Sequence, residues 1–301
     1  MTAEWPGIRA FIKRHNALYT FARVAKLMRR VPPRHWLEPH RLRAIARIAL
    51  RTMVSGPRLV NAWECTRRIE REQIPGAIVE CGVCGGGCAG LMALSSRRYG
   101  EGPRALHLFD SFRGLPQPSR HDRDVVDAFR AAHPGVEPDE GGDAAQLTPI
   151  RVCVGPSAER VRSFLIDELD IDSRQVIIHE GWFQETVPAA ADDIGPIAIL
   201  RLDGDLYEST RVCLDHLYDR VVEGGFVIVD DYGTFAGCRK AVDEFFARRG
   251  AAVKLIDIDG DGVYLRKNEP ARPRSSAAKQ SATDRSPGIR TAHASHPVCT
   301  S

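Results

Sequence analysis

The chain has 301 residues, of which 43% are hydrophobic, and a formal net charge of +3, which is enough apolar material for one sizeable core. It contains no run of about 18 apolar residues, so we expect no membrane-spanning helix, and it lacks the short apolar segment of a secretory signal near residue 1. The charge is uneven, with a net +10 over residues 1–51, +3 over residues 268–301 and −10 over residues 52–267. An acidic middle region argues against nucleic-acid binding by the globular part.

Residues 1–51 form a basic arm that precedes the main domain, which we assign to residues 52–267. Apolar residues recur at helical spacing over 8–30 and predict an amphipathic helix, which Val31-Pro32-Pro33 ends because proline removes a backbone donor. Two further helices are predicted over 38–52 and 57–73. The arm shares its Arg-rich composition with transit peptides, but we favour a helical arm that packs on the body or joins a second copy of the chain in a homo-oligomer.

Strands and helices then alternate along the chain. Five apolar strands are predicted at "AIVE", "RALHLF", "QVIIHEGWF", "PIAILRLD" and "GGFVIVDD", with helices over 157–169, 208–222 and 236–249. The segments "VKLIDI" and "GVYLR" close the fold as a final pair of strands around "DGDG". This "DIDGDG" run also resembles the start of a calcium loop, but position twelve is Asn268, so we favour a hairpin turn. The alternation predicts an α/β fold with a mostly parallel sheet, a final antiparallel strand and helices on both faces.

Two segments depart from this alternation. Residues 117–150 are rich in Pro, Gly, Asp and Glu, with one helix predicted near 123–132. They form either a lid over the site or an inert surface insertion. Residues 268–301 contain few large aliphatic side chains and are predicted to be a disordered tail.

The stretch "IVECGVCGGGCAGLMA", residues 78–93, allows two interpretations. Cys81, Cys84 and Cys88 have spacing suited to a metal cluster, but a fourth ligand with a matching motif is absent. A strand, a glycine-rich turn that contains Gly82 and Gly86, and a helix start instead predict a loop that binds a cofactor through backbone N–H groups. The eight cysteines, in a chain with no export signal, then indicate reduced thiols and a cytoplasmic protein.

Acidic residues at the strand ends indicate which cofactor binds. Glu80 precedes the glycine loop and suits a cationic amino group rather than a pyrophosphate. Asp110 ends the second strand, where it would accept hydrogen bonds from ribose hydroxyls, although it could also cap a turn with Ser111. Trp182 either stacks on an adenine or packs in the core. The two acids describe S-adenosylmethionine better than NAD.

A second group of acids follows the fourth and fifth strands. Asp203 and Asp205 follow the fourth strand, and Asp230 and Asp231 follow the fifth. The ends of parallel strands meet at one edge of the sheet, and clustered carboxylates there would repel each other unless a cation neutralised them. We therefore predict that Asp203, Asp230 and Asp231 bind Mg²⁺ or a similar ion. For Asp205 a helix cap and a functional role remain open.

Taken together, these stretches resemble the macrocin O-methyltransferase family. The resemblance covers about residues 50–266 and rests on "TMVSGPRLVNAWE", "IPGAIVECGVCGGG", "FDSFRGLP", "GWFQETVP", "LRLDGDLYEST" and "GGFVIVDDYGTFAGCRKAVDEFF". It implies a Rossmann-like class I methyltransferase fold and transfer of a methyl group from S-adenosylmethionine, with magnesium, to a hydroxyl of a small molecule. The sequence departs from the family pattern at Cys84, Gly85 and Cys88.

The resemblance also implies residue roles. Asp203 would be both a metal ligand and the general base. Asp230 and Asp231 would be the other two metal ligands. Glu80, Gly82 and Asp110 would hold the donor, and Met53 would lie against it. We add Gly86, Ser111 and Trp182 to the predicted cofactor residues.

Two other functions are compatible with parts of the sequence. A haloacid-dehalogenase-type phosphatase would use "LDGD" and "DD", but it leaves Glu80 and the glycine loop without a role. A non-catalytic domain that binds a partner through the cationic arm would leave Asp203, Asp230 and Asp231 without a role.

Overall fold

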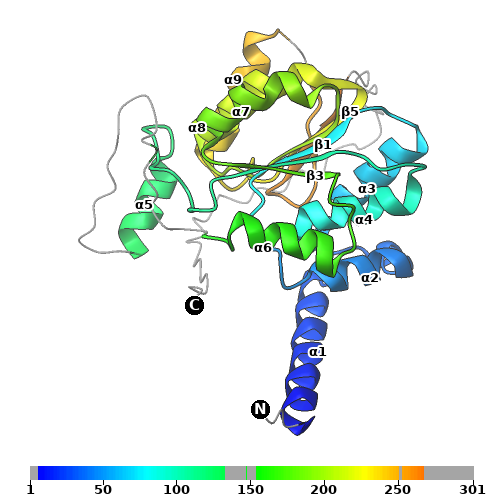
Figure 1. Cartoon of the computed structure of the whole chain (residues 1–301). Coiled ribbons are helices and arrows are strands. Elements are labelled where there is room, and N and C mark those ends of the chain that lie inside the picture. Colours follow the sequence, from blue (N-terminus) through cyan, green and yellow to red (C-terminus); the bar gives the residue numbers. More distant parts are fainter. Residues whose placement is uncertain (1–5, 133–146, 148–153, 251–252, 268–301) are drawn as a thin grey trace, which may run out of the picture. The chain divides into compact units, whose positions relative to one another are not determined.

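A seven-stranded sheet forms the centre of the fold. We analysed a computed structural model, which describes residues 6–132, 147, 154–250 and 253–267 (Figure 1). The strand order is β3-β2-β1-β4-β5-β7-β6. The strands are β1 (Ala77–Cys81), β2 (Leu106–Asp110), β3 (Val176–Glu180), β4 (Ile197–Leu202), β5 (Val221–Val229), β6 (Ile256–Asp257) and β7 (Val263–Arg266). Strands β1 to β5 pair in parallel, whereas β7 runs antiparallel to β5 and β6. The predicted mostly parallel sheet with a final antiparallel strand is therefore confirmed.

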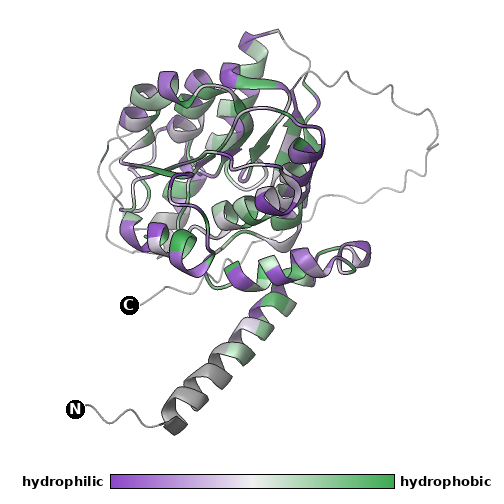
Figure 2. Ribbon diagram, turned by 45° about the vertical axis from the view of Figure 1, so that its right-hand side comes forward, coloured by the Kyte–Doolittle hydropathy of each residue, from purple (hydrophilic) through white to green (hydrophobic). Residues whose placement is uncertain are grey.

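Helices cover both faces of this sheet and enclose two apolar cores (Figure 1). One core lies between the sheet and the helices α2 (Pro39–Ile48), α3 (Gly56–Arg71), α4 (Gly87–Tyr99) and α6 (Ala158–Ser163), which continues as a π-helical turn, Phe164–Glu168. The other core lies under α7 (Phe183–Ile194), α8 (Tyr207–Leu217) and α9 (Ala236–Arg248). Figure 2 shows hydrophobic strands between helices that carry hydrophilic residues on part of their surface. Burial on both faces explains why the strands read as continuous apolar runs.

Two predicted boundaries are wrong. The third strand ends at Glu180 rather than continuing to Phe183, because Gly181 turns the backbone at φ 145° and α7, which we did not predict, begins at Phe183. The predicted helix 208–222 ends early, because α8 stops at Leu217 and β5 begins at Val221, which pairs with Ile197 of β4.

The basic arm is helical, as predicted. Helix α1 spans Pro6–Met28, a short 3-10 turn spans Pro33–His35, and Leu27, Met28 and Val31 are buried against the body. Leu18, Tyr19 and Phe21 on α1 are exposed, which is compatible with the predicted homo-oligomer, and that association stays a prediction. No helix within the described ranges is long and apolar enough to cross a membrane.

The insertion at 117–150 is described as far as residue 132 and contains α5 (Arg123–Ala132), close to the predicted helix. Most of its second half and the predicted tail, 268–301, lie outside the described residues.

A histidine pair, of which His107 is buried and His179 half-buried, connects β2 to β3. His107 Nδ1 lies 3.1 Å from His179 Nε2, and the His179 ring stacks on Phe109 with ring centroids 4.1 Å apart. Burial and then the neighbouring His179 lower the pKa of His107 to about 4, and burial lowers the pKa of His179 as well. The pair therefore favours neutral imidazoles in the folded chain.

We expect this pair to make the protein less stable in mild acid. The unfolded chain binds more protons than the folded chain between the ordinary histidine pKa, about 6.5, and the lowered value, so stability falls as the pH falls through that window. For His107 the loss of unfolding free energy from pH 7 to pH 5 is about 2 kcal/mol. Urea titrations of wild type and His107→Asn at several pH values measure this loss, because the difference between their free energies of unfolding should shrink as the pH falls. The control variant His216→Asn, at an exposed position, should keep the wild-type pH profile. A difference that does not change with pH would contradict this role.

Candidate active site

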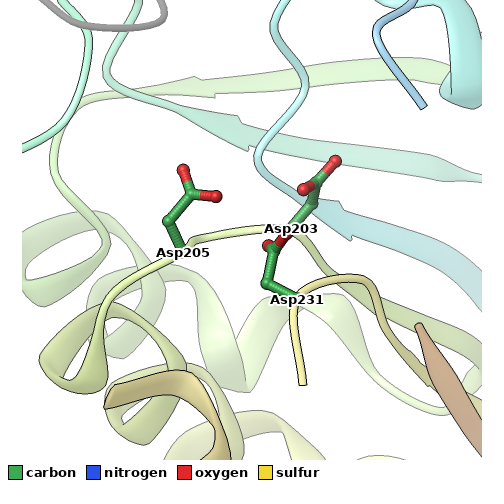
Figure 3. Close-up of side chains that lie close together, drawn as sticks. All are labelled: Asp203, Asp205 and Asp231. Carbon is green, nitrogen blue, oxygen red and sulfur yellow. The ribbon is translucent and has the colours of Figure 1, made fainter. Parts of the chain in front are cut away.

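Three carboxylates gather at the edge of the sheet where the parallel strands end. Asp203 follows β4 in the chain, Asp205 lies two residues further on, and Asp231 follows β5 (Figure 3). One carboxylate oxygen from each lies within 4.8 Å of the others, and this is the group that could hold a metal ion among the described residues. Asp231 is buried, and its Oδ2 has no hydrogen-bond partner. The cysteines of the glycine loop do not belong to this group.

Asp230 lies in a different environment. Its Oδ1 accepts a hydrogen bond of 2.5 Å from Arg201 Nη2, and its Oδ2 forms an ion pair with Arg58 of α3. Arg58 also bonds Asp259, in the turn between β6 and β7, and so ties that predicted hairpin to the site. The structure therefore groups Asp205, rather than Asp230, with Asp203 and Asp231, and the predicted part of Asp230 in metal binding stays a prediction.

A fully buried arginine joins these acids to Glu80. Arg201 Nη1 donates to Glu80 Oε1 at 2.9 Å and to Asp203 Oδ2 at 2.8 Å. Strand register explains the contact, because Glu80 of β1 stands opposite Arg201 of β4. Glu80 Oε2 is buried without a hydrogen-bond partner.

Burial and mutual repulsion shift the pKa values of this cluster. Burial raises the pKa of Glu80 to about 7, although Arg201 opposes the shift. Burial, followed by the charge of Asp203, raises the pKa of Asp205 to about 8 and that of Asp230 to about 6. The pKa of Asp231 rises well above its usual range, again first through burial. A bound cation would stabilise the ionised forms of all these groups.

The glycine loop packs against the chain itself. Gly82 has φ 96°, and a Cβ at this position would lie 1.8 Å from the carbonyl oxygen of Asp203. A Cβ on Gly85 or Gly87 would lie 2.5 or 2.6 Å from the carbonyl oxygen of Arg51. These glycines are thus required by close approach of the protein backbone, which brings β1, the residue after β4 and the end of the arm together.

Asp110 organises the same loop. Its Oδ2 accepts hydrogen bonds of 2.8 Å from the backbone N–H groups of Val83 and Cys84, and its Oδ1 accepts one of 2.7 Å from Phe112. The turn role that the sequence left open is therefore observed, and a contact with a ribose stays a prediction.

The remaining predicted cofactor residues are Gly86, Ser111, Trp182 and Met53. Gly86 precedes α4 at φ 78°, and Ser111 Oγ donates to the carbonyl of Gly114. Trp182 is buried at the start of α7, whereas Met53 is 65% exposed.

Comparison with known proteins identifies the family. The sequence pattern of the macrocin-O-methyltransferase (TylF) family matches residues 44–267. The chain belongs to the macrocin O-methyltransferase family. This membership makes it a methyltransferase and does not favour the phosphatase or the non-catalytic binding domain.

Curated relatives of the chain include two antibiotic-tailoring enzymes. The 8-demethyl-8-(2,3-dimethoxy-alpha-L-rhamnosyl)-tetracenomycin-C 4'-O-methyltransferase of Streptomyces olivaceus is 37% identical over 215 residues, which cover 71% of this chain and 75% of the relative. The demethyldecarbamoylnovobiocin O-methyltransferase of Streptomyces niveus is 37% identical over 216 residues, 72% of this chain and 75% of the relative.

Solved structures agree with the fold. The O-methyltransferase NovP superposes with a TM-score of 0.61 at 32% identity and covers 83% of this chain and 98% of its own. The calicheamicin methyltransferase CalS11 has a TM-score of 0.55 at 22% identity, over 89% of this chain and 95% of its own. The predicted class I methyltransferase fold is therefore confirmed.

Sequence analysis missed both arginines of the site. An arginine in the middle of "AILRLD" was a usable signal, because a charge inside a strand that is buried on both faces requires acidic partners. Arg58 lies on an ordinary amphipathic helix and gave no comparable signal.

Proposed function

We propose that this methyltransferase transfers a methyl group from S-adenosylmethionine to a hydroxyl of a sugar carried by a small molecule, with the help of a divalent cation. The observation that carries the proposal is the group of Asp203, Asp205 and Asp231 at the sheet edge, beside the glycine loop. The two Streptomyces relatives, which are O-methyltransferases of a rhamnosyl tetracenomycin and of demethyldecarbamoylnovobiocin, support a hydroxyl acceptor of this class.

The residues fit a divalent cation. Three closely spaced carboxylates form a hard oxygen donor set of the kind that Mg²⁺ prefers, and the unpartnered Oδ2 of Asp231 is satisfied by such a ligand. In the arrangement observed Asp205 supplies the third carboxylate, whereas Asp230 would first have to leave Arg58 and Arg201. When bound, the cation supplies a positive charge that lowers the pKa of the acceptor hydroxyl.

The residues also fit the donor. The unpartnered Oε2 of Glu80 is a buried acceptor suited to the ammonium group, and the carboxylate of Asp110 retains acceptor capacity for a ribose hydroxyl. Met53 is exposed and free to pack against the donor, as the family resemblance implies.

The acceptor would approach from the side of α5 and α9. A cavity of about 500 Å³ lies between these helices and is lined by Asp124, Thr234, Arg239 and their neighbours. It borders the segment that follows Asp231, whereas Asp203, Asp205 and Asp231 are not among its lining residues, so the reacting end of the acceptor would have to extend beyond it.

In the proposed reaction the acceptor oxygen attacks the methyl carbon in line with the carbon–sulfur bond. That bond breaks with its electron pair going to sulfur, and Asp203 takes the hydroxyl proton. The chain contributes mainly by positioning, because oxygen, carbon and sulfur must be aligned, and by removal of the proton.

Removal of divalent ions tests this proposal. We expect EDTA-treated protein to bind S-adenosylhomocysteine but to lose methyl transfer by about 100-fold or more, with recovery when MgCl₂ is added. The acceptors are the sugar-bearing substrates named for the two Streptomyces relatives, and product is followed by mass spectrometry. Full activity after chelation would remove the cation from the proposal, and failure to bind S-adenosylhomocysteine would remove the donor.

A further inference from the structure

The start of the insertion, residues 117–124, is fastened to the loops that carry the catalytic carboxylates. Asp122 is 1% exposed, and its Oδ1 accepts a hydrogen bond of 2.8 Å from the backbone N–H of Tyr207, the first residue of α8. Asp124 Oδ2 accepts one of 2.8 Å from the N–H of Ala236, the first residue of α9. Two acids of one segment thus cap the two helices that follow β4 and β5.

Asp122 is built into this position. Its Oδ2 accepts hydrogen bonds from the backbone N–H and the hydroxyl of Ser119, at 2.9 and 2.7 Å. A Cβ on Gly237 of α9 would lie 1.9 Å from Asp122 Oδ1, so the carboxylate is seated between α8 and α9. The His121 ring packs on the Tyr207 ring with centroids 4.2 Å apart.

The loop that receives Asp122 is strained. Asp205 has φ 59°, a left-handed conformation that costs a non-glycine residue free energy and persists only where the surroundings impose it. The N–H of Asp203 is held by the carbonyl of Cys81 at one end of the loop, and the N–H of Tyr207 is held by Asp122 at the other. Removal of Asp122 leaves the second end without its acceptor.

We propose that Asp122 is a positioning residue, which holds Asp205 in the carboxylate group and fixes the start of the insertion as a wall of the site rather than a free lid. Asp124 fastens the same wall to α9, beside the segment after Asp231. The cation-binding part of this inference rests on the proposed function. The hydrogen bonds of Asp122 and Asp124 to the first residues of α8 and α9, which we call the clamp, do not depend on it.

Amide hydrogen exchange and metal titration of the full chain test the proposal. In Asp122→Ala we expect the amides of the peptide that contains Tyr207, and those of residues 117–124, to exchange about tenfold faster or more. The affinity for Mn²⁺, measured by calorimetry, should fall about tenfold while that for S-adenosylhomocysteine stays within about twofold. Asp122→Asn retains one acceptor oxygen for the N–H of Tyr207, but its amide nitrogen cannot accept from the N–H of Ser119, so its exchange and Mn²⁺ affinity should lie between those of wild type and Asp122→Ala. Asp127→Ala, at an exposed position of α5, should leave the exchange and the Mn²⁺ affinity unchanged.

Unchanged exchange around Tyr207 in Asp122→Ala would overturn the clamp. Unchanged Mn²⁺ affinity with faster exchange would overturn the positioning of Asp205. If wild type binds no Mn²⁺, the proposed function loses its cation, and exchange still decides the clamp. If Asp122→Ala does not fold, Asp124→Ala is tested instead. Faster amide exchange in the peptide that contains Ala236 would then support the clamp, and exchange at the wild-type rate would overturn it.

Discussion

Replacement of Arg201 with methionine is expected to lower the free energy of unfolding by about 3–5 kcal/mol, because it leaves the buried Glu80 and Asp230 and the half-buried Asp203 without their common counter-charge. Arg201 is 1% exposed and bonds Glu80, Asp203 and Asp230. Methionine has a similar length, so loss of packing is a small part of the effect. Urea unfolding followed by circular dichroism measures the change.

A conservative variant and a mutant cycle separate charge from packing. Arg201→Lys keeps the charge but loses the planar fork that reaches several acids at once, so we expect an intermediate loss. Glu80→Gln should be less destabilising in the Arg201→Met background than in wild type, because it removes a carboxylate that has lost its partner. Additive effects of the two substitutions, or a loss below about 1 kcal/mol in Arg201→Met, would show that the acids are neutralised in another way.

Arg201 also shows how the sheet organises the site. Glu80, Arg201 and Ile228 lie in register on three adjacent strands, and Asp230 follows one pleat later on the same face. Glu80, which is predicted to bind the donor, therefore shares one guanidinium with Asp203 and Asp230, two of the three acids predicted to bind the cation. Two sites that the sequence presents as separate motifs form one electrostatic unit.

The sequence was sufficient for the parallel strands, for most of their helices but not α7, and for the gathering of acids at one edge of the sheet. Apolar runs ending in acids carry that information locally, since strand ends meet at one edge. The position of each carboxylate was not available in the same way. Asp203, Asp205, Asp230 and Asp231 look equivalent in the sequence, but Arg58 and Arg201 engage only some of them, and those contacts depend on tertiary packing.

The glycines of the loop have an observed structural role that differs from the predicted one. They were interpreted as room for a cofactor, whereas Gly82, Gly85 and Gly87 face backbone carbonyls of Asp203 and Arg51. A single sequence cannot distinguish close approach of a ligand from close approach of the chain itself. The role of Asp122 could not be predicted for a similar reason, because its hydrogen-bond partner Tyr207 lies 85 residues away in the chain.

Replacement of Asp203 with asparagine is expected to reduce methyl transfer by about 10³-fold or more, while S-adenosylhomocysteine still binds. Asparagine can accept a hydrogen bond from Arg201, so we expect the fold to persist. It cannot take the proton of the acceptor, and as a neutral ligand it holds a cation less strongly than a carboxylate does.

Two measurements resolve these contributions. Raising the MgCl₂ concentration should recover the part of the activity that was lost through weaker cation binding, and the remaining deficit reports the missing base. Asp193→Asn, an exposed site on α7, is the matched control and should keep wild-type activity. Turnover within about tenfold of wild type in Asp203→Asn would exclude Asp203 as the base. Asp205 would then be the next candidate for the group that takes the proton. It lies in the same loop and has a raised pKa, and this loop is bonded to Asp122 of the insertion through the N–H of Tyr207.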